Sequence, residues 1–494
     1  MANKNCIAVF DMGTTSVKVC LFTPQMEMIS WSVQEYELFA EGSLVEARAE
    51  EYLRAARDGM RDALSRAEGY QVAAISVTTQ GETLVPVDRE GNALHRFLVW
   101  LDGRAEEEAA LLQSRIGEMD FYRTTGLPEI SGALPLAKLL WFRNHHPEIY
   151  HNTYKFLLLE DYLLWWLTGK MVCEKALATS TGWFDLNTDG YWTEGLEIAG
   201  INPEKLPELM ECGAFVGPLT DATARALGLE PGIPVTTGAM DQTAAALAGG
   251  CTEPGTVTET TGAALVLAAA TDKPTFAEGH HVTIYRHALP GKFIYLPIGN
   301  TGGMALQWFR NEFCKDLPAG RPGFAALDAE VEAVPYGCEG LVFLPFLSGS
   351  VDPDSCPEAR ACFFGAGLGT TRAHFGRSVM EAICFLVRDF FEMLEALNCP
   401  VDRVYSLGGG SRSPLWLQMK ADICHRTFQA AGCSEATAMG AALLAAWGTG
   451  LLEPGTRPQI EKGGIYAPNE AHAEACDRAY RLYKNLYTAV KPLF

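Results

Sequence analysis

One pattern occurs twice along this chain, at its beginning and near its middle. Residues 7–22 join two apolar runs through a turn of one glycine and three hydroxyl residues. Residues 255–267 repeat the design, with threonines and a glycine at the turn. Two hairpins of one design, opening two halves of similar length, predict a duplicated domain with a ligand in the cleft between the copies.

The first turn also indicates what that ligand is. Bare backbone at a glycine, with N–H and O–H donors beside it, allows close approach of a polyphosphate. Asp11 is well placed to hold the accompanying magnesium through its water shell. An ordinary hairpin turn built of small residues is the alternative, and the chain lacks the G-x-x-x-x-G-K-[ST] pattern of a P-loop. We expect a magnesium nucleotide here, held by Asp11, Gly13, Thr14, Thr15 and Lys18.

Length and charge narrow the class of protein. A chain of 494 residues is too long for one core, and alternating strand-like and helical periods indicate α/β architecture. We place the domain boundary at 250, giving domains 1–250 and 251–494. A net charge of −21 argues against nucleic acid or an anionic membrane surface as partner. Without a signal-like apolar region or an apolar stretch of membrane-spanning length, we expect a cytoplasmic protein.

Asp241 is the candidate for chemistry. Residues 234–250 read as a strand, a turn and an alanine-rich helix, and Asp241 lies where the helix begins. A helix N-cap is the alternative role. A carboxylate at a helix N-terminus stays ionised and can accept a proton as a hydroxyl attacks a γ-phosphoryl group.

A second polar cluster follows two predicted strands. Gln80, Gly81 and Glu82 come after the strand 72–77, which itself follows an amphipathic helix predicted over 44–66, and Trp100 and Asp102 come after the strand 96–99. Amide, carboxylate and guanidinium groups at strand ends suit a substrate with several hydroxyls. The alternative is a surface salt bridge from Asp102 to Arg104, with an ordinary turn at Gly81.

Three glycines mark a further ligand position. Gly408, Gly409 and Gly410 follow the strand predicted over 401–407 and precede the helix predicted over 414–423. A tight strand-to-helix turn would explain them as well. At the end of a strand, we interpret them as backbone against which a planar or phosphorylated ligand lies.

Together these residues resemble the FGGY family of carbohydrate kinases, through nearly the whole chain. The segments 135–145 and 361–381 are similar to the two family signatures. The resemblance implies two ribonuclease-H-like, actin/hexokinase-type domains closing on ATP, Mg²⁺ and a sugar or polyol. It also implies, as family habit, a homodimer. Asp241 falls on the family's catalytic aspartate, and Asp11, Gly13, Thr14 and Thr15 match the first phosphate motif. The second phosphate motif matches Thr260, Thr261 and Gly262, and the adenosine segment matches Gly408, Gly409, Gly410, Ser411, Ser413 and Gln418.

Departures from the family bear on the substrate. Gly81 stands where glycerol kinases have an arginine, although Asp241 and Gln242 fit that branch. The segment 100–104 is closer to pentulose kinases. We expect an ATP-dependent kinase of a ketose such as xylulose, of another pentulose or of an alditol. Its substrate residues are Gln80, Gly81, Glu82, Trp100, Asp102, Asp241 and Gln242. An actin or heat-shock-type ATPase switch and a catalytically inactive sugar sensor are the alternatives.

Overall fold

The computed structural model describes residues 4–277, 279, 281–432, 435–457 and 463–494. The chain forms two compact α/β units. Unit 1 contains residues up to 248 together with 283–293 and 435–459, and unit 2 contains the remainder. Two segments from the second half of the sequence therefore belong to unit 1, and the domain boundary at 250 stays a prediction.

Unit 1 is built on a mixed sheet with the strand order β14-β15-β6-β1-β2-β3. The hairpin β1–β2 is antiparallel, and β6 lies parallel to β1 on its other side. Side chains of β1 alternate between two buried faces, which explains its continuous apolar run. The sheet strands are β1 (Lys4–Met12), β2 (Ser16–Phe22), β3 (Met28–Glu35), β6 (Tyr70–Thr79), β14 (Phe215–Pro218) and β15 (Pro234–Thr236).

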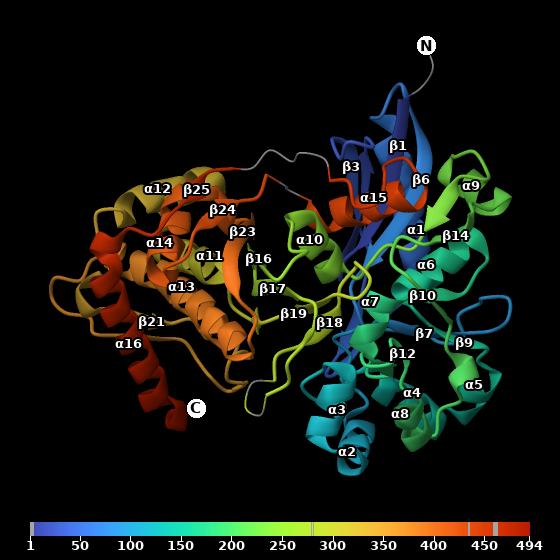
Figure 1. The fold of residues 1–494 in the computed structure, drawn as a ribbon, viewed down its shortest axis with the longest axis horizontal. Coiled ribbons are helices and arrows are strands. Elements are labelled where there is room, and N and C mark those ends of the chain that lie inside the picture. The colour runs from blue at the N-terminus through green and yellow to red at the C-terminus, as the bar shows by residue number, and fades with distance from the viewer. Residues whose placement is uncertain (1–3, 278, 280, 433–434, 458–462) are drawn as a thin grey trace. The chain divides into compact units, whose positions relative to one another are not determined.

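Two helices cover this sheet, from distant parts of the sequence. Helix α1 (Ala49–Ser65) packs against β2 and β3, and α15 (Ala436–Gly448) packs against β6 and β1. Figure 1 shows α15, coloured orange-red, beside the blue strands β1 and β6. The remaining helices of unit 1 are α2 (Glu106–Arg115), α3 (Glu118–Thr125), α4 (Pro135–His145), α5 (Pro147–Asn152), α6 (Leu159–Thr168), α7 (Lys175–Ala178), α8 (Thr193–Ala199), α9 (Asp221–Leu227) and α10 (Asp241–Gly249).

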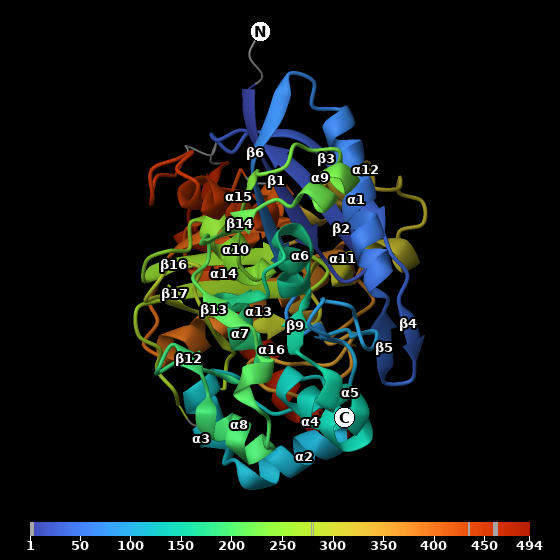
Figure 2. The same ribbon diagram turned by 90° about the vertical axis from the view of Figure 1, so that its right-hand side faces the viewer.

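A second, smaller sheet and a helical group complete unit 1. Helices α2, α4 and α8 contact one another and gather at one end of the unit, as Figure 2 shows. The smaller sheet has the order β4-β5-β8-β7-β9. The remaining strands are β4 (Phe39–Glu41), β5 (Leu44–Ala47), β7 (Leu84–Val87), β8 (Phe97–Leu98), β9 (Lys155–Leu158), β10 (Val172–Glu174), β11 (Phe184–Asp185), β12 (Gly190–Tyr191), β13 (Glu208–Met210) and β18 (Ile284–Arg286).

Unit 2 repeats the strand pattern of unit 1. The hairpin β16–β17 is antiparallel, β23 lies parallel to β16, and β24 lies parallel to β23. This is the arrangement of β1, β2, β6 and β15, so the predicted duplication is present in the fold. The strands are β16 (Gly255–Thr261), β17 (Leu265–Thr271), β19 (Phe293–Tyr295), β20 (Ile298–Gly299), β21 (Val342–Leu344), β22 (Cys362–Phe364), β23 (Val401–Gly408), β24 (Phe428–Ala430) and β25 (Ile465–Tyr466).

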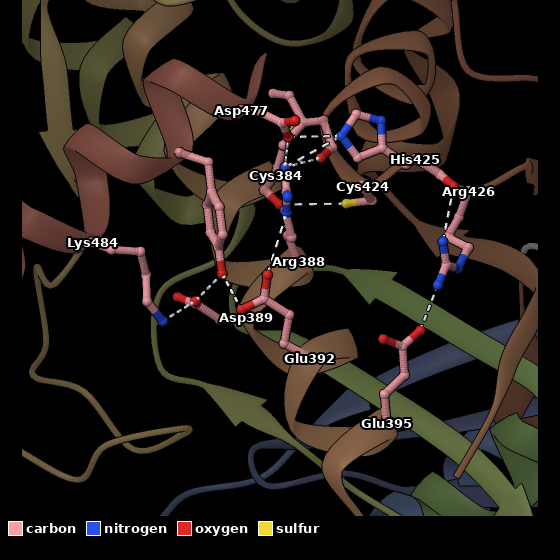
Figure 3. Close-up of polar contacts among 12 residues, drawn as sticks. Cys384, Arg388, Asp389, Glu392, Glu395, Cys424, His425, Arg426, Asp477 and Lys484 are labelled. Atoms are coloured by element: carbon pink, nitrogen blue, oxygen red, sulfur yellow. Dashed lines mark hydrogen bonds and ion pairs between the residues drawn. The ribbon is translucent and has the colours of Figure 1, made fainter. Parts of the chain in front are cut away.

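The helices of unit 2 pack on a long buried helix, α13. Figure 3 shows how charged side chains join its outer part to its neighbours: Arg388 of α13 donates to Asp477, and Lys484 donates to Asp389. His425 also contacts Asp477, at 2.9 Å. The helices are α11 (Gly303–Phe313), α12 (Arg321–Val331), α13 (Arg372–Ala396), α14 (Pro414–Cys424) and α16 (Ala473–Val490). Six short 3₁₀ helices occur in the described parts of the two units, at Thr179–Thr181, Pro203–Lys205, Cys338–Gly340, Gly410–Arg412, Glu470–His472 and Lys491–Leu493.

One local expectation is wrong at its start. The helix predicted over 44–66 begins only at Ala49, because residues 44–47 form β5 and pair with β4 and β8. The hydrophobic pattern with a period of 3.6 residues continues over these residues, but their backbone forms hydrogen bonds with neighbouring strands instead. Among the described residues, no helix combines the length and apolar character needed to cross a membrane.

Candidate active site

The turn between β1 and β2 is a closed hairpin turn. The Gly13 N–H donates to the Ser16 carbonyl at 3.0 Å, and the Tyr36 N–H donates to the Thr15 carbonyl at 3.1 Å. A Cβ added at Gly13 would have its nearest neighbour at 3.4 Å, an ordinary contact. The fold therefore has room for a side chain at Gly13. Without one, the backbone of Gly13 is accessible to a ligand that approaches from outside the protein.

Asp11 and Lys18 face each other across this hairpin. They are register partners in the β1–β2 ladder, and Lys18 donates to Glu435 at 2.5 Å. Burial raises the pKa of the Asp11 carboxyl to about 7, the Asp241 charge adds to the rise, and Lys18 opposes it. The Asp11 carboxyl accepts no hydrogen bond from the described residues, so it is available to a ligand.

Asp241 begins α10, as predicted. One carboxyl oxygen accepts the Gln242 N–H at 2.6 Å, and the other has no hydrogen-bond partner among the described residues. Burial raises the pKa of Asp241 to about 6, and the hydrogen bond from Gln242 opposes the rise. The carboxyl therefore combines an anchored oxygen with a free one, and it is mostly ionised at neutral pH.

Gln80 and Trp100 connect the polar cluster to the first hairpin. The Gln80 side chain donates to Thr83 at 3.1 Å, and the Trp100 indole donates to the Thr14 hydroxyl at 3.0 Å. The buried Gln80 Oε1 has no partner among the described residues. Because an unpaired buried acceptor is costly, this oxygen suits a ligand hydroxyl.

Glu82 lies in the same neighbourhood as Asp241. Burial raises the pKa of Glu82 to about 7, Lys138 opposes the rise, and the Asp241 charge adds to it. Burial, with smaller contributions from the charges of Glu82 and Asp241, holds the pKa of Tyr285 of β18 well above its usual value. Three acids of unit 1, Asp11, Glu82 and Asp241, thus share one region.

Asp102 is placed differently from the rest of the cluster. Both of its oxygens accept hydrogen bonds from Arg104, at 2.7 Å each, and one also accepts the Val45 N–H at 2.6 Å. Its side chain is fully buried. These contacts favour a role in fixing the segment that carries Trp100, and direct contact of Asp102 with substrate stays a prediction.

The second Thr/Gly turn, in unit 2, rests on a buried charge pair. Lys420 of α14 donates to both oxygens of Glu259 and to the Thr261 hydroxyl, each at 2.9 Å, and all are buried. Ser406 of β23 donates to Glu259 at 2.8 Å. Beyond them, a Cβ on Gly262 would meet nothing closer than 3.8 Å. The turn thus rests on a fully buried ion pair and leaves space beside the Gly262 backbone.

The three glycines lie against this same turn. Gly408 has a φ of +74°, and a Cβ on Gly410 would lie 2.7 Å from the Cβ of Thr261. The fold itself therefore needs glycine at both positions. Ser413 caps α14 by accepting the Trp416 N–H, and Gln418 donates to Asp422 and to the Ala467 carbonyl. Gly408, Gly409, Ser411, Ser413 and Gln418 all keep some exposed surface.

Sequence reasoning missed several residues of these regions: Glu160, Glu174, Ser180 and Tyr285. Acidic residues are mostly exposed in proteins, and only the fold shows Glu160 of α6 and Glu174 of β10 to be buried. Tyr285 comes from the second half of the sequence and joins unit 1 by tertiary packing alone. The sequence holds no local signal for it. Glu435, which resembles the start of the family's helix after the adenosine segment, also joins unit 1 in this way.

Known proteins share the architecture over the whole chain. A crystal structure of xylulose kinase from Rhodospirillum rubrum matches with a TM-score of 0.90 and 27% identity, covering 99% of each chain. Among curated relatives, a gluconokinase from Bacillus licheniformis is 28% identical over 97% of this chain and 95% of its own. A glycerol kinase from Brucella ovis is 32% identical over 90% of both chains. The fold is therefore that of a two-domain sugar or polyol kinase.

Family models match both halves. Residues 6–248 match the N-terminal domain, and residues 256–449 the C-terminal domain, of the FGGY family of carbohydrate kinases. The chain belongs to this family and is a carbohydrate kinase. Family membership decides against the actin or heat-shock-type ATPase switch, and the inactive sensor, which would be a member of the same family, is tested by ADP release.

Proposed function

We propose that this protein transfers the γ-phosphoryl group of ATP to a hydroxyl of a neutral ketose, such as xylulose or another pentulose, or of an alditol. Asp241 is the general base, and Gln80, Glu82, Trp100 and Gln242 contact the substrate. The turn residues Gly13, Thr14, Thr15, Thr260, Thr261 and Gly262, together with Lys18, contact phosphates. Gly408, Gly409, Gly410, Ser411, Ser413 and Gln418 contact the adenosine.

The free carboxyl oxygen of Asp241 carries the proposal. It lies at a helix start, within the electrostatic range of Asp11 from the phosphate-type hairpin and of Glu82 from the polar cluster. An ionised carboxylate that lies near both the phosphate-type hairpin and the polar cluster can take the proton of an attacking hydroxyl. A coupled ADP-release assay over a panel of ketoses and polyols tests it, and ADP release independent of any sugar would overturn it.

Asp11 suits magnesium. Its carboxyl is free of hydrogen bonds from the described residues, and hard cations prefer such oxygen ligands. No group of three or more described His, Cys, Asp or Glu side chains could hold a metal. This matches a site in which Mg²⁺ is held by one carboxylate together with substrate phosphates, where it supplies charge neutralisation at the transferring group.

The charges of the polar cluster favour a neutral acceptor over a sugar acid. Its cations are engaged: Arg104 is paired with Asp102 and Glu46, and buried Lys138 donates to the Val99 carbonyl at 2.9 Å. Glu82 and Asp241 would repel a substrate carboxylate. We expect kcat/KM for gluconate to fall at least tenfold below that for the best pentulose, measured in the same ADP-release panel.

The rate should depend on pH through the base. Because a protonated carboxyl cannot accept a proton, kcat/KM should fall about tenfold per pH unit below the apparent pKa, about 6 for Asp241. The carboxyl of Glu82, whose pKa burial raises to about 7, titrates in the same range and broadens the transition. A profile of kcat/KM between about pH 5 and pH 8 measures it, and a flat profile would contradict the assignment.

Gly81 should be sensitive to a single methyl group. Its Cβ would lie 2.9 Å from the Ser180 hydroxyl and 3.3 Å from the Met240 sulfur, next to the base. Gly81→Ala should lower kcat/KM for the acceptor about tenfold, since small displacements at a reacting centre are costly. Gly103→Ala is the matched control, because its Cβ would meet nothing closer than 3.7 Å. Equal activity of the two variants would refute the expectation.

A further inference from the structure

The segment 237–240, which leads into Asp241, is held along its length by buried side chains. The Ser76 and Thr78 hydroxyls of β6 donate to the carbonyls of Thr237 and Ala239, at 3.3 and 2.6 Å. Glu160 accepts the Gly238 N–H at 3.0 Å, and Glu174 accepts the Met240 N–H at 2.9 Å. Carbonyls and N–H groups of this segment are thus bonded in strict alternation by four side chains.

The contact between this segment and β6 is also very close. A Cβ added at Gly238 would lie 1.7 Å from the Val77 carbonyl oxygen. No side chain fits there, so the backbone of the segment lies directly on the strand that continues to Gln80. The position of Asp241 is therefore tied to that of the polar cluster.

Burying the side chains of Glu160 and Glu174 costs free energy. Ser76, Thr78, Glu160 and Glu174 are all fully buried, and burial holds the pKa of Glu160 well above its usual value and raises that of Glu174 to about 7. Glu160 makes one hydrogen bond among the described residues, to Gly238, and its Oε2 has no partner there. Burying such an acid destabilises the fold. We therefore infer that the role of Glu160 lies in its one hydrogen bond, to Gly238.

Glu174 joins the base to a second part of the site. It accepts the Ala176 N–H at 2.6 Å and the Leu177 N–H at 2.5 Å, which caps α7. The 3₁₀ helix that follows α7 carries Ser180, the residue packed against Gly81. One carboxyl group thus fixes the base segment and the wall behind Gly81 together.

We propose that Glu160 and Glu174, with Ser76 and Thr78, are positioning residues that hold segment 237–240 and so aim the Asp241 carboxyl at the acceptor hydroxyl. The inference rests on the proposed function, because these residues act through Asp241 as the general base and catalyse no reaction of their own. Loss of one of these contacts should misplace the carboxyl and lower turnover by on the order of 10- to 100-fold. Nucleotide binding should be unaffected.

Asp161 offers a matched control beside Glu160. It is equally buried and belongs to the same helix, but it accepts the Leu158 N–H at 2.8 Å and makes no hydrogen bond to segment 237–240 among the described residues. Asp161→Asn should therefore lower the melting temperature and leave kcat within about threefold. Glu160→Met, which removes the acceptor for Gly238, should lower kcat while the KM for ATP stays within about threefold.

Two further variants separate positioning from stability. Glu160→Gln keeps a carbonyl oxygen for Gly238 and should recover most of the turnover that Glu160→Met loses. Thr78→Val removes only the hydroxyl that donates to Ala239, in an isosteric side chain, and should lower kcat even if Glu160→Met does not fold. The readouts are kcat and KM per nucleotide-binding site, with the melting temperature of each variant.

The outcomes are distinct. Undiminished kcat in Thr78→Val and Glu160→Met, or an equal loss of kcat in Asp161→Asn, would overturn the inference. Undiminished turnover in Asp241→Asn would instead overturn the proposed function. An inactive Asp241→Asn beside fully active Thr78→Val and Glu160→Met variants would remove the positioning role and leave the base in place.

Discussion

Asp241→Asn is expected to lower kcat by on the order of 10²–10⁴-fold or more, because the proton of the attacking hydroxyl loses its acceptor. The asparagine side chain has nearly the same shape and keeps an oxygen for the Gln242 N–H. The fold and the affinity for ATP should therefore be preserved. Coupled ADP release with the best acceptor gives kcat, and calorimetric titration with ATP gives the binding constant.

Asp221→Asn provides the control for this substitution. Asp221 also begins a helix of unit 1, α9, but its side chain is exposed and lies outside the proposed site. Its replacement should leave kcat unchanged. A kcat of Asp241→Asn within about threefold of the parent protein would exclude Asp241 as the general base.

Lys420→Met is expected to destabilise the protein by about 3–5 kcal/mol, because it leaves the buried carboxylate of Glu259 without its cation. The pair is fully buried, and Lys420 also donates to the Thr261 hydroxyl. Loss of this support should loosen the second Thr/Gly turn and raise the KM for ATP in the protein that remains folded. Urea unfolding followed by circular dichroism measures the stability.

Two comparisons test whether the unpaired buried charge is the reason for this loss of stability. Adding Glu259→Gln to Lys420→Met removes the orphaned charge and keeps an acceptor for Ser406, so part of the stability should return. Arg66→Met breaks an exposed pair with Asp62, whose side chains are 50% and 47% exposed, and should cost no more than about 1 kcal/mol. Equal losses of unfolding free energy in Lys420→Met and Arg66→Met would show that burial does not determine how much the ion pair stabilises the protein.

Local patterns predicted the central elements correctly. Apolar runs on either side of a Thr/Gly turn produce β1–β2 and β16–β17, because a hairpin depends on residues that are close in the sequence. The strand before the three glycines and the helix after them are present as β23 and α14. The start of α10 at Asp241 follows in the same way from its alanine-rich sequence.

The one local failure occurred where distant segments decide the outcome. Residues 44–47 were predicted as helix and pair as a strand, because β4 and β8 take up their backbone hydrogen bonds. The partners of Asp102 likewise became visible only in the fold: Arg104 and the Val45 N–H bind its carboxyl group, and its contact with substrate stays a prediction. A sequence shows that a residue is polar, but it does not show which partner satisfies it.

The sequence by itself determined the two hairpins, the α/β class, the family and the identity of Asp241 as the candidate base. These depend on short-range patterns and on motifs that lie within continuous segments. Only the tertiary structure decided that α15 and Tyr285 belong to unit 1, and that Glu160 and Glu174 bond to the segment before Asp241. Those contacts join residues far apart in the chain, and burial, which gives the two acids their unusual pKa values, exists only once the chain has packed.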